Sequence, residues 1–428
     1  MDSPVVWFSF SMVAFFCGAL IFIYPLSAAL LFPFFYIFYN YSPGFGTIDL
    51  LLTTYTLFVV MAKNTVNCNN INQYQINKTL VGLFVILFAG AIVSTLNTPF
   101  EQHKAIYYTM TKLFSKAAIV YVIVNLINTE YDLQLCLKSM LLFIILALLT
   151  TAYFTFKFKN PFFMREGFFT GQGVIYESVL THPNMLSRVL ILFIPLVYIY
   201  SFFFKDRLFF HLVQTVCFCA MFIPLICISS AASVGLMGVM AILMFKKRKI
   251  VVMLMIMITL LSVVTSARIE ERYAEVLTKG YALGKREVTA AASLESFKEH
   301  PFIGTGSRSI LERLQKYGGH KFQRGGEIVY EYEHNSYLTA LVEFGLLGLG
   351  LFIILLFNYI KYIIKIIRYD ADPFTRNLLI GAVLGFSGFL ITTFTGGDIY
   401  DNILWYQVGF TLALVKIASF RNVMARTV

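Results

Sequence analysis

The sequence predicts an all-α polytopic membrane protein with twelve or thirteen transmembrane helices and a large folded extracytoplasmic loop. Hydrophobic residues make up 58% of its 428 residues, charged residues only 13%, and the mean hydropathy is +0.74. A soluble protein of this length does not need so much apolar material for its core, and it would lack charges for its surface. Apolar runs long enough to cross a bilayer, such as 80–96 and 250–267, recur along the chain and indicate helices.

The spanning segments follow one another through most of the chain. The first run has neither a basic amino-terminal stretch nor a small-residue cleavage site, so we interpret it as a retained helix rather than a signal peptide. Pro25 and Pro33 interrupt the early pattern, which leaves the count at twelve or thirteen. In chain order, the segments are expected at 5–24, 26–39, 48–62, 79–96, 113–127, 137–156, 186–204, 208–228, 231–245, 250–267, 336–357, 378–396 and 401–418.

Short basic connectors set the orientation, because they are retained on the cytoplasmic side. When the crossings alternate, the basic tail and three basic connectors fall on one side of the membrane. The connectors are 205–207 (KDR), 246–249 (KKRK) and 361–368 (KYIIKIIR). The opposite, extracytoplasmic face then receives the two longest polar loops. The predicted regions are N-terminal transmembrane helices at 1–157, an extracytoplasmic loop at 158–185, central transmembrane helices at 186–267, a large extracytoplasmic loop at 268–335 and C-terminal transmembrane helices at 336–428.

The net charge of +11 does not indicate a nucleic-acid partner. The basic residues lie at the ends of predicted helices, where they set topology and meet the anionic headgroups of membrane lipids. The six cysteines fall mostly in apolar segments and lack paired CxxC spacing. We therefore expect no disulfide framework and no metal site.

Polar chemistry is concentrated in the loop at 268–335. Its mixture of both charges with glycines, tyrosines and the helical-looking stretch REVTAAASLESFKEH (286–300) indicates a folded segment rather than a linker. Inside the predicted membrane helices polar residues are few, with Glu343 the main exception, whereas a channel or transporter would show a polar path through the membrane. This distribution favours an enzyme acting at the outer interface. The loop supplies Arg286, Arg308, Arg313, His320, Arg324 and His334.

Three motifs carry a resemblance to a known family. HNSYLTALVEFGLLG (334–348) has a His-Asn pair, nine residues, Gly, two residues and Gly. Upstream, LGKREVTAAASLESFKEHPFIGTG (283–306) has an Arg-led helix that closes on a Pro-x2-Gly-x-Gly turn, and THPNMLSRVL (181–190) precedes both. Together and in this order, they make the chain from about 168 onwards similar to the O-antigen ligase and O-antigen polymerase family. The resemblance implies a C-type glycosyltransferase-like fold.

The resemblance also implies an activity and a place in the cell. Such enzymes move a glycan from undecaprenyl diphosphate to an acceptor sugar hydroxyl on the periplasmic face of the bacterial inner membrane, by a metal-independent, inverting reaction without a cofactor. His334 would accept the hydroxyl proton when neutral or contact the leaving phosphate when charged. Arg286 would hold the diphosphate, because a guanidinium offers a charged, bidentate fork. The implied partners are the lipid-linked oligosaccharide, an acceptor glycolipid, membrane lipids and a chain-length regulator protein.

One departure from the family pattern affects the donor site. The family often has a Ser-Arg pair at an outer turn, but here that turn, 228–238, contains no arginine. A replacement could come from Arg188, Arg165 or Arg308. The departure favours a polymerase of O-antigen or capsule repeat units over a ligase, which would transfer the glycan to lipid A-core; a lipid-linked oligosaccharide transporter is a remoter alternative. The predicted substrate-binding residues are Asn335, Arg188, Arg308, His182, Asn184 and Glu343.

Structural interpretations stay open beside these roles. His334 can cap the helix entrance, Arg286 can pair with a neighbouring glutamate, and Glu343 can serve helix packing. THPN can be a simple turn before a helix that begins near Pro183. The acidic triplet DAD (370–372) is interpreted as part of a charged connector rather than a metal site. Gly345 and Gly348 are expected to let a neighbouring helix pack closely and to fix the histidine on a rigid helix.

Overall fold

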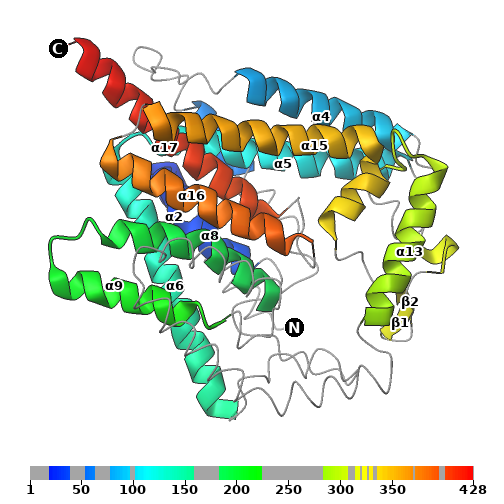
Figure 1. Ribbon diagram of the computed structural model, residues 1–428, viewed down its shortest axis with the longest axis horizontal. Helices are drawn as coiled ribbons and strands as arrows, with labels where there is room; N and C mark the ends of the chain where they lie inside the picture. The colour runs from blue at the N-terminus through cyan, green and yellow to red at the C-terminus, as the bar shows by residue number, and fades with distance from the viewer. Residues whose placement is uncertain are drawn as a thin grey trace.

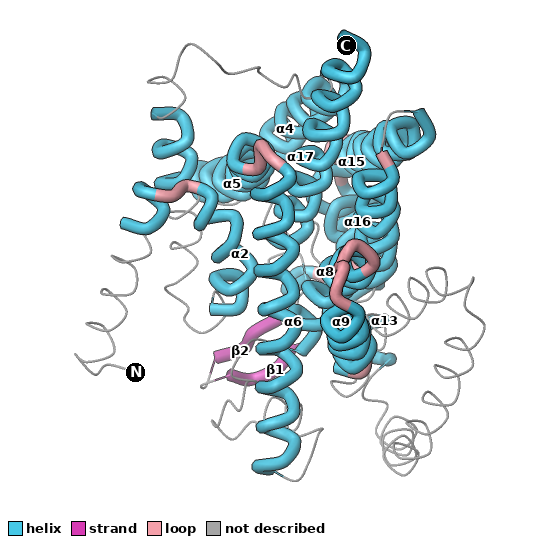
Figure 2. The backbone as a smooth tube through the Cα atoms, turned by 90° about the vertical axis from the view of Figure 1, so that its left-hand side faces the viewer, coloured by secondary structure: helices cyan, strands magenta, loops and turns pink. Residues whose placement is uncertain are grey.

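The structure is a computed structural model, and helices make up nearly all of the chain that it describes (Figure 1). The prediction of an all-α polytopic membrane protein is confirmed. A two-stranded antiparallel hairpin is added to the helices in the long loop (Figure 2). The described residues are 19–38, 54–62, 78–96, 102–158, 183–223, 283–306, 314–318, 321–324, 327–330, 335–369, 372–394 and 401–427.

The labelled helices follow the predicted spans closely where the two can be compared. They are α2 (Leu26–Phe38), α4 (Lys78–Leu96), α5 (Gln102–Leu126), α6 (Glu130–Phe158), α8 (Pro183–Ser201), α9 (Arg207–Ala220), α13 (Leu283–Glu299), α15 (Ser336–Tyr369), α16 (Pro373–Thr392) and α17 (Asn402–Thr427). The hairpin consists of β1 (Lys321–Arg324) and β2 (Glu327–Tyr330), with Lys321 opposite Tyr330. The predicted spans at 231–245 and 250–267 lie outside the described residues, as do most of 5–24 and part of 48–62.

Three described helices are long and apolar enough to cross a membrane: Glu130–Tyr153, Ser336–Arg368 and Pro373–Thr392. Four shorter apolar helices accompany them, at Leu80–Leu96, Leu113–Leu126, Leu186–Ser201 and Arg207–Ala220. Helix α5 begins at Gln102, well before the predicted start at 113. The prediction followed the apolar run alone, whereas the polar residues before it belong to the same helix.

Two short connectors meet at one end of the bundle, which we name the connector end (residues 202–206 and 372–374). The ring of Phe203, after α8, packs edge-on against the ring of Phe374, in α16, with centroids 4.6 Å apart. Asp206 and Asp372 each cap the helix that follows: Asp206 accepts from the N–H of Leu208 at 2.8 Å, and Asp372 from that of Phe374 at 2.9 Å. The last residue of the DAD triplet thus serves as a helix cap.

The core of the bundle is an aromatic cluster that joins four helices. The ring of Tyr406 in α17 stacks on Phe32 of α2 at 5.0 Å and meets Phe193 of α8 at 6.1 Å. Phe193 in turn contacts Phe143 of α6 at 5.7 Å. The hydroxyl of Tyr406 donates to the carbonyl oxygen of Ala29 at 3.0 Å, so its polar end is satisfied inside the core.

Helix α8 is held against α16 by close backbone approach. A Cβ added to Gly385 would lie 3.0 Å from the carbonyl oxygen of Leu192, which is tighter than ordinary contact. Small residues of this kind let membrane helices pack at short distance. The contact fixes the position of α8, whose first turns carry the predicted site residues Asn184 and Arg188.

Candidate active site

Two of the motifs found in the sequence lie directly against one another in the structure. Helix α13 ends at Glu299, and the turn Pro301–Gly306 that follows docks against α15 where that helix is interrupted. The interruption is at Gly345, whose φ of 68° and ψ of −171° are not helical. We name the assembly of 301–306, 342–347 and Ser94 the glycine junction. Figure 1 shows the short first segment of α15 turning away from the long second segment.

Backbone groups released by the break are satisfied by the turn. The N–H groups of Thr305 and Gly306 donate to the carbonyls of Val342 and Glu343, at 3.0 and 2.9 Å. In the opposite direction, the N–H groups of Leu346 and Leu347 donate to the carbonyls of Pro301 and Phe302, at 2.9 and 3.1 Å. A helix break inside a membrane protein is tolerated only when such partners exist, so the turn and the break require each other.

Both central glycines are needed for this approach. A Cβ on Gly304 would lie 2.5 Å from the carbonyl carbon and oxygen of Glu343, and one on Gly345 would lie 2.3 Å from the carbonyl oxygen of Phe302. Both residues also have positive φ, at 81° and 68°. The expectation that Gly345 packs against a neighbouring helix within a rigid helix is wrong: it faces a turn, and it interrupts its own helix. At Gly348 an added Cβ would meet Phe344 of α15 itself, at 2.2 Å.

Ser94, near the end of α4, completes the glycine junction. Its Oγ donates to the carbonyl oxygen of Glu343 and accepts from the N–H of Gly306 at 3.1 Å. The serine is fully buried, as is Thr305, whose hydroxyl donates to the carbonyl of Val342 at 3.1 Å. Sequence reasoning did not identify Ser94. The one local signal was a Ser-Thr pair at the end of an apolar run, and such pairs usually bond within their own helix.

Helix α13 is anchored to the first segment of α15 by a small separate core. Its buried members are Ala292 of α13, Leu314 and Val342 of α15. Val342 belongs to the glycine junction, so this core packs α13 against the junction; Ser293 and Ser296 of α13 are also buried. Arg286 lies on the first turn of α13, and its side chain is outside the described part of the structure.

The start of α15 is fixed by a cap and by α16. The side-chain oxygen of Asn335 accepts from the N–H groups of Tyr337 and Leu338, at 3.0 and 3.1 Å, which is an N-cap. The N–H of Ser336 donates to the carbonyl of Thr393 at 3.0 Å, just past the end of α16. His334 immediately precedes this cap and lies outside the described residues. The structure thus assigns the cap to Asn335, and the capping interpretation of His334 lies outside the described residues.

Glu343 is almost fully buried, at 1% exposure, two residues before the break in α15. Its backbone carbonyl accepts from both Ser94 and Gly306. The structure thus gives this residue a backbone role in the glycine junction, beside the substrate contact predicted for its side chain.

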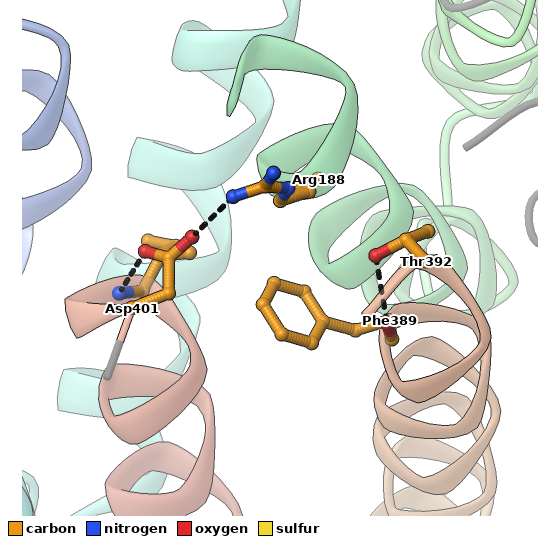
Figure 3. A network of polar contacts seen from close by, with 5 residues as sticks. Arg188, Phe389, Thr392 and Asp401 are labelled. Carbon is orange, nitrogen blue, oxygen red and sulfur yellow. Dashed lines mark hydrogen bonds and ion pairs between the residues drawn. The ribbon is translucent and has the colours of Figure 1, made fainter. Parts of the chain in front are cut away.

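Arg188 forms a buried ion pair that the sequence did not predict. Its Nη1 lies 3.3 Å from Oδ2 of Asp401, at the start of α17, and the two side chains are 11% and 3% exposed. Figure 3 shows them pointing toward one another across the gap between α8 and α17, beside Phe389 and Thr392 of α16. The other carboxylate oxygen of Asp401 accepts from the N–H of Ile403 at 3.4 Å. Asp401 lies in a polar stretch before an apolar helix, and this local pattern predicts only a helix cap.

A second cation reaches the start of α17 from another helix. Lys116 of α5 is buried, and its ammonium group donates to Oδ1 of Asn402, next to Asp401. Helices α5 and α8 thus place one cation each at the start of α17, against its first residue and the residue before it.

The structure brings part of the predicted site together. Asn335 caps the short first segment of α15, and Glu343 lies on that segment, which contacts the end of α16 close to Arg188. Asn184 lies in the first turn of α8, with its side chain outside the described part. His182, Arg308 and His334 lie outside the described residues altogether.

The comparison with known families bears on this same region. A family model described as O-antigen ligase matches residues 216–353, about a third of the chain. The match includes α13, the Pro301–Gly306 turn and the first segment of α15 with its break at Gly345. No curated protein matches the chain. The resemblance found in the sequence is thereby confirmed over residues 216–353, which are similar to the family described as O-antigen ligase.

Proposed function

We propose that the protein is a membrane glycosyltransferase that moves a glycan from undecaprenyl diphosphate to an acceptor sugar hydroxyl on the periplasmic face of the bacterial inner membrane. The family match supports a glycosyltransferase of the O-antigen ligase and polymerase type. The observation that carries the proposal is the glycine junction, because it joins the helix of Arg286 to the segment that follows His334. These are the two residues to which we assign the chemistry.

The proposed reaction is a single displacement with inversion. The acceptor hydroxyl oxygen attacks the anomeric carbon of the donor, and the bond from that carbon to the diphosphate oxygen breaks. His334, as the neutral imidazole, takes the hydroxyl proton. Arg286 binds the diphosphate and stabilises the negative charge that develops as the lipid carrier leaves, a role that a metal ion fills in other transferases. In this scheme Asn335, Arg188, Arg308, His182, Asn184 and Glu343 contact the substrates.

Polymerisation of O-antigen or capsule repeat units is our first choice of reaction. The turn at 228–238 lacks the arginine of the family's Ser-Arg pair, which departs from the ligase pattern. Ligation to lipid A-core is the second candidate, and the description of the matched family favours it. For a polymerase, a chain-length regulator protein is the expected partner.

The glycan of a deletion strain decides between these reactions. Single repeats on lipid A would show that a polymerase was lost, whereas long chains left on the carrier lipid would show that a ligase was lost. An unchanged glycan profile would contradict both. A translocation assay distinguishes a transferase from a transporter. If the protein is a transferase, variants of His334 and Arg286 lose glycan transfer, while translocation of the lipid-linked donor continues.

A further inference from the structure

Arg188 is a buried cation whose hydrogen-bonding capacity is mostly unused within the described part of the chain. The residue is 9% exposed, and its one ion pair there is the contact from Nη1 to Asp401. A guanidinium carries five N–H donors, so those on Nε and Nη2 have no partner among the described residues. Burying a cation with so few contacts is unfavourable unless another acceptor reaches it.

The contact with Asp401 is also a long one. Its 3.3 Å exceeds the 2.7–2.9 Å that is usual for a charge-assisted hydrogen bond, and it uses one guanidinium nitrogen rather than two. A phosphate group offers several oxygens to the planar fork and can bind it through two parallel hydrogen bonds. An anion of that shape therefore satisfies Arg188 better than the carboxylate does.

We infer that Asp401 is an exchangeable counter-ion, which holds Arg188 when the donor is absent and is displaced by the diphosphate of the lipid-linked donor. The inference rests on the proposed function, and it adds a regulatory contact to that site. Both residues lie outside the region matched by the family model, on α8 and at the start of α17.

The position of the pair links it to the proposed base. Arg188 and Asp401 lie beside Phe389 and Thr392 near the end of α16 (Figure 3). The next residue, Thr393, accepts the hydrogen bond from Ser336, two residues after His334. The end of α16 thus lies near the ion pair and also contacts the start of α15. A diphosphate on Arg188 would place the scissile bond on the side of the bundle where α15 begins.

Removal of the competing carboxylate tests the inference. Asp401→Asn keeps the shape of the side chain, and Asp401→Ser keeps a residue that can cap α17, while both remove the charge. Purified wild type and variants are titrated with undecaprenyl diphosphate in detergent, and binding is measured directly rather than through glycan transfer. Both variants are expected to bind about fivefold tighter or more, because the ligand no longer competes with an internal anion. Arg188→Gln is expected to bind more weakly, and the double variant Arg188→Gln/Asp401→Asn to bind like Arg188→Gln.

Controls identify the group that binds and the residue that responds. Undecaprenol, which has the same chain without phosphates, should show no difference between Asp401→Asn and wild type. Inorganic pyrophosphate tests whether a free diphosphate gives the same response, and phosphatidylglycerol tests whether a membrane headgroup does. If Asp401→Asn binds phosphatidylglycerol more tightly than wild type to the same extent, the ligand is the lipid headgroup and not the donor, which would overturn the proposal. Asp372→Asn is the matched change at a helix cap at the connector end, and it should leave binding unchanged.

The contrary results are equally specific. Unchanged or weaker binding of undecaprenyl diphosphate by folded Asp401→Asn and Asp401→Ser would overturn the exchange. Loss of the folded protein in both variants would make the pair a purely structural tie, which also overturns it. If the wild type binds the diphosphate as described but transfers no glycan, the proposed function fails while the exchange stands.

Discussion

The connector end and the glycine junction lie at opposite ends of α15, and they satisfy their backbone groups in different ways. At the connector end, Asp206 and Asp372 accept hydrogen bonds from the helix that directly follows each of them. At the glycine junction, the bonds join the 301–306 turn to α15 and to Ser94, more than two hundred positions away in the sequence. A locally closed connector needs little from the rest of the fold, whereas the junction exists only when three distant segments are in place.

The difference indicates where substitutions should matter for function. A change at the connector end should be absorbed locally and alter stability slightly. A change at the junction end should disturb the segments that hold His334 and Arg286. Five experiments test this contrast, in order of decreasing expected effect. They use matched residues at the two ends where the chain offers them.

The largest effect is expected for His334→Ala, which should abolish glycan transfer with normal expression and membrane insertion. The reason is that no other group is assigned to take the proton of the acceptor hydroxyl. His211→Ala is the matched control, since His211 is exposed in the second turn of α9, the helix that follows the connector end. Glycan chain length on gels reports both variants. Near-normal chains in His334→Ala would remove this histidine from the mechanism.

Gly345→Ala should lower the free energy of unfolding by about 3 kcal/mol or more and reduce transfer severely. The added Cβ meets the backbone of Phe302, and the positive φ of Gly345 is unfavourable for alanine. Gly90→Ala in α4 is the control, because nothing lies within 4 Å of its added Cβ and alanine favours a helix. Thermal unfolding in detergent measures both. Equal stability of the two variants would contradict the close approach of the turn.

Arg286→Lys should lose most of its activity although the charge is kept, because an ammonium group cannot bind a diphosphate through two parallel hydrogen bonds. Arg376→Lys, at an exposed position in the first turn of α16, is the same change at the connector end and should be silent. Transfer by the purified variants is compared with that of Arg286→Ala. Recovery of most activity by lysine where alanine has none would mean that only the charge is needed.

Asp372→Ala should lower the free energy of unfolding by about 1 kcal/mol, the usual effect of losing an N-cap, and leave transfer unchanged. The carboxylate of Asp372 binds the N–H groups of Phe374 and Thr375 and the hydroxyl of Thr375, all within its own helix. Unfolding and transfer are measured on the same preparation. A loss of transfer beyond the loss of folded protein would mean that the connector end is coupled to the site.

The smallest effect is expected from chelation of divalent cations, which should leave transfer unchanged. We assign the stabilisation of the leaving diphosphate to arginine, which requires no free cation. A reconstituted assay with purified protein, lipid-linked donor and EDTA measures this. Activity that is lost in EDTA and returns with Mg²⁺ or Mn²⁺ would contradict the metal-free mechanism and direct attention to Glu327, Glu331 and Glu333.

Much of the fold was predictable because it depends on local patterns. Apolar runs of membrane-spanning length gave α4, α6, α8 and α16 with starts that differ from the structure by no more than a turn or two, and Pro183 begins α8 as the THPN turn suggested. The start of α5 was missed, since its first turns, 102–112, are polar and carry no hydropathy signal. A short polar hairpin such as β1 and β2 likewise leaves little trace in an apolar sequence.

The candidate site was predictable only as a set of motifs. The spacing of the glycines in 301–306 and at Gly345 identified both halves of the junction, but not that they bind each other through the backbone. Ser94 and Asp401 were missed because their roles depend on contacts with helices distant in the sequence. No local pattern distinguishes them from an ordinary helix serine and an ordinary helix cap.

The bond from Ser94 has a consequence for attempts to exchange parts between related enzymes. The region matched by the family model ends at 353 and begins at 216, yet its central turn depends on a hydroxyl from α4. A chimera that grafts only the matched region onto a foreign amino-terminal half would remove this hydroxyl, which donates to the carbonyl of Glu343 and shares the N–H of Gly306 with that carbonyl. Grafts that carry residues 78–96 together with 216–353 should therefore insert and function where the shorter graft fails, which makes α4 the true amino-terminal boundary for recombination.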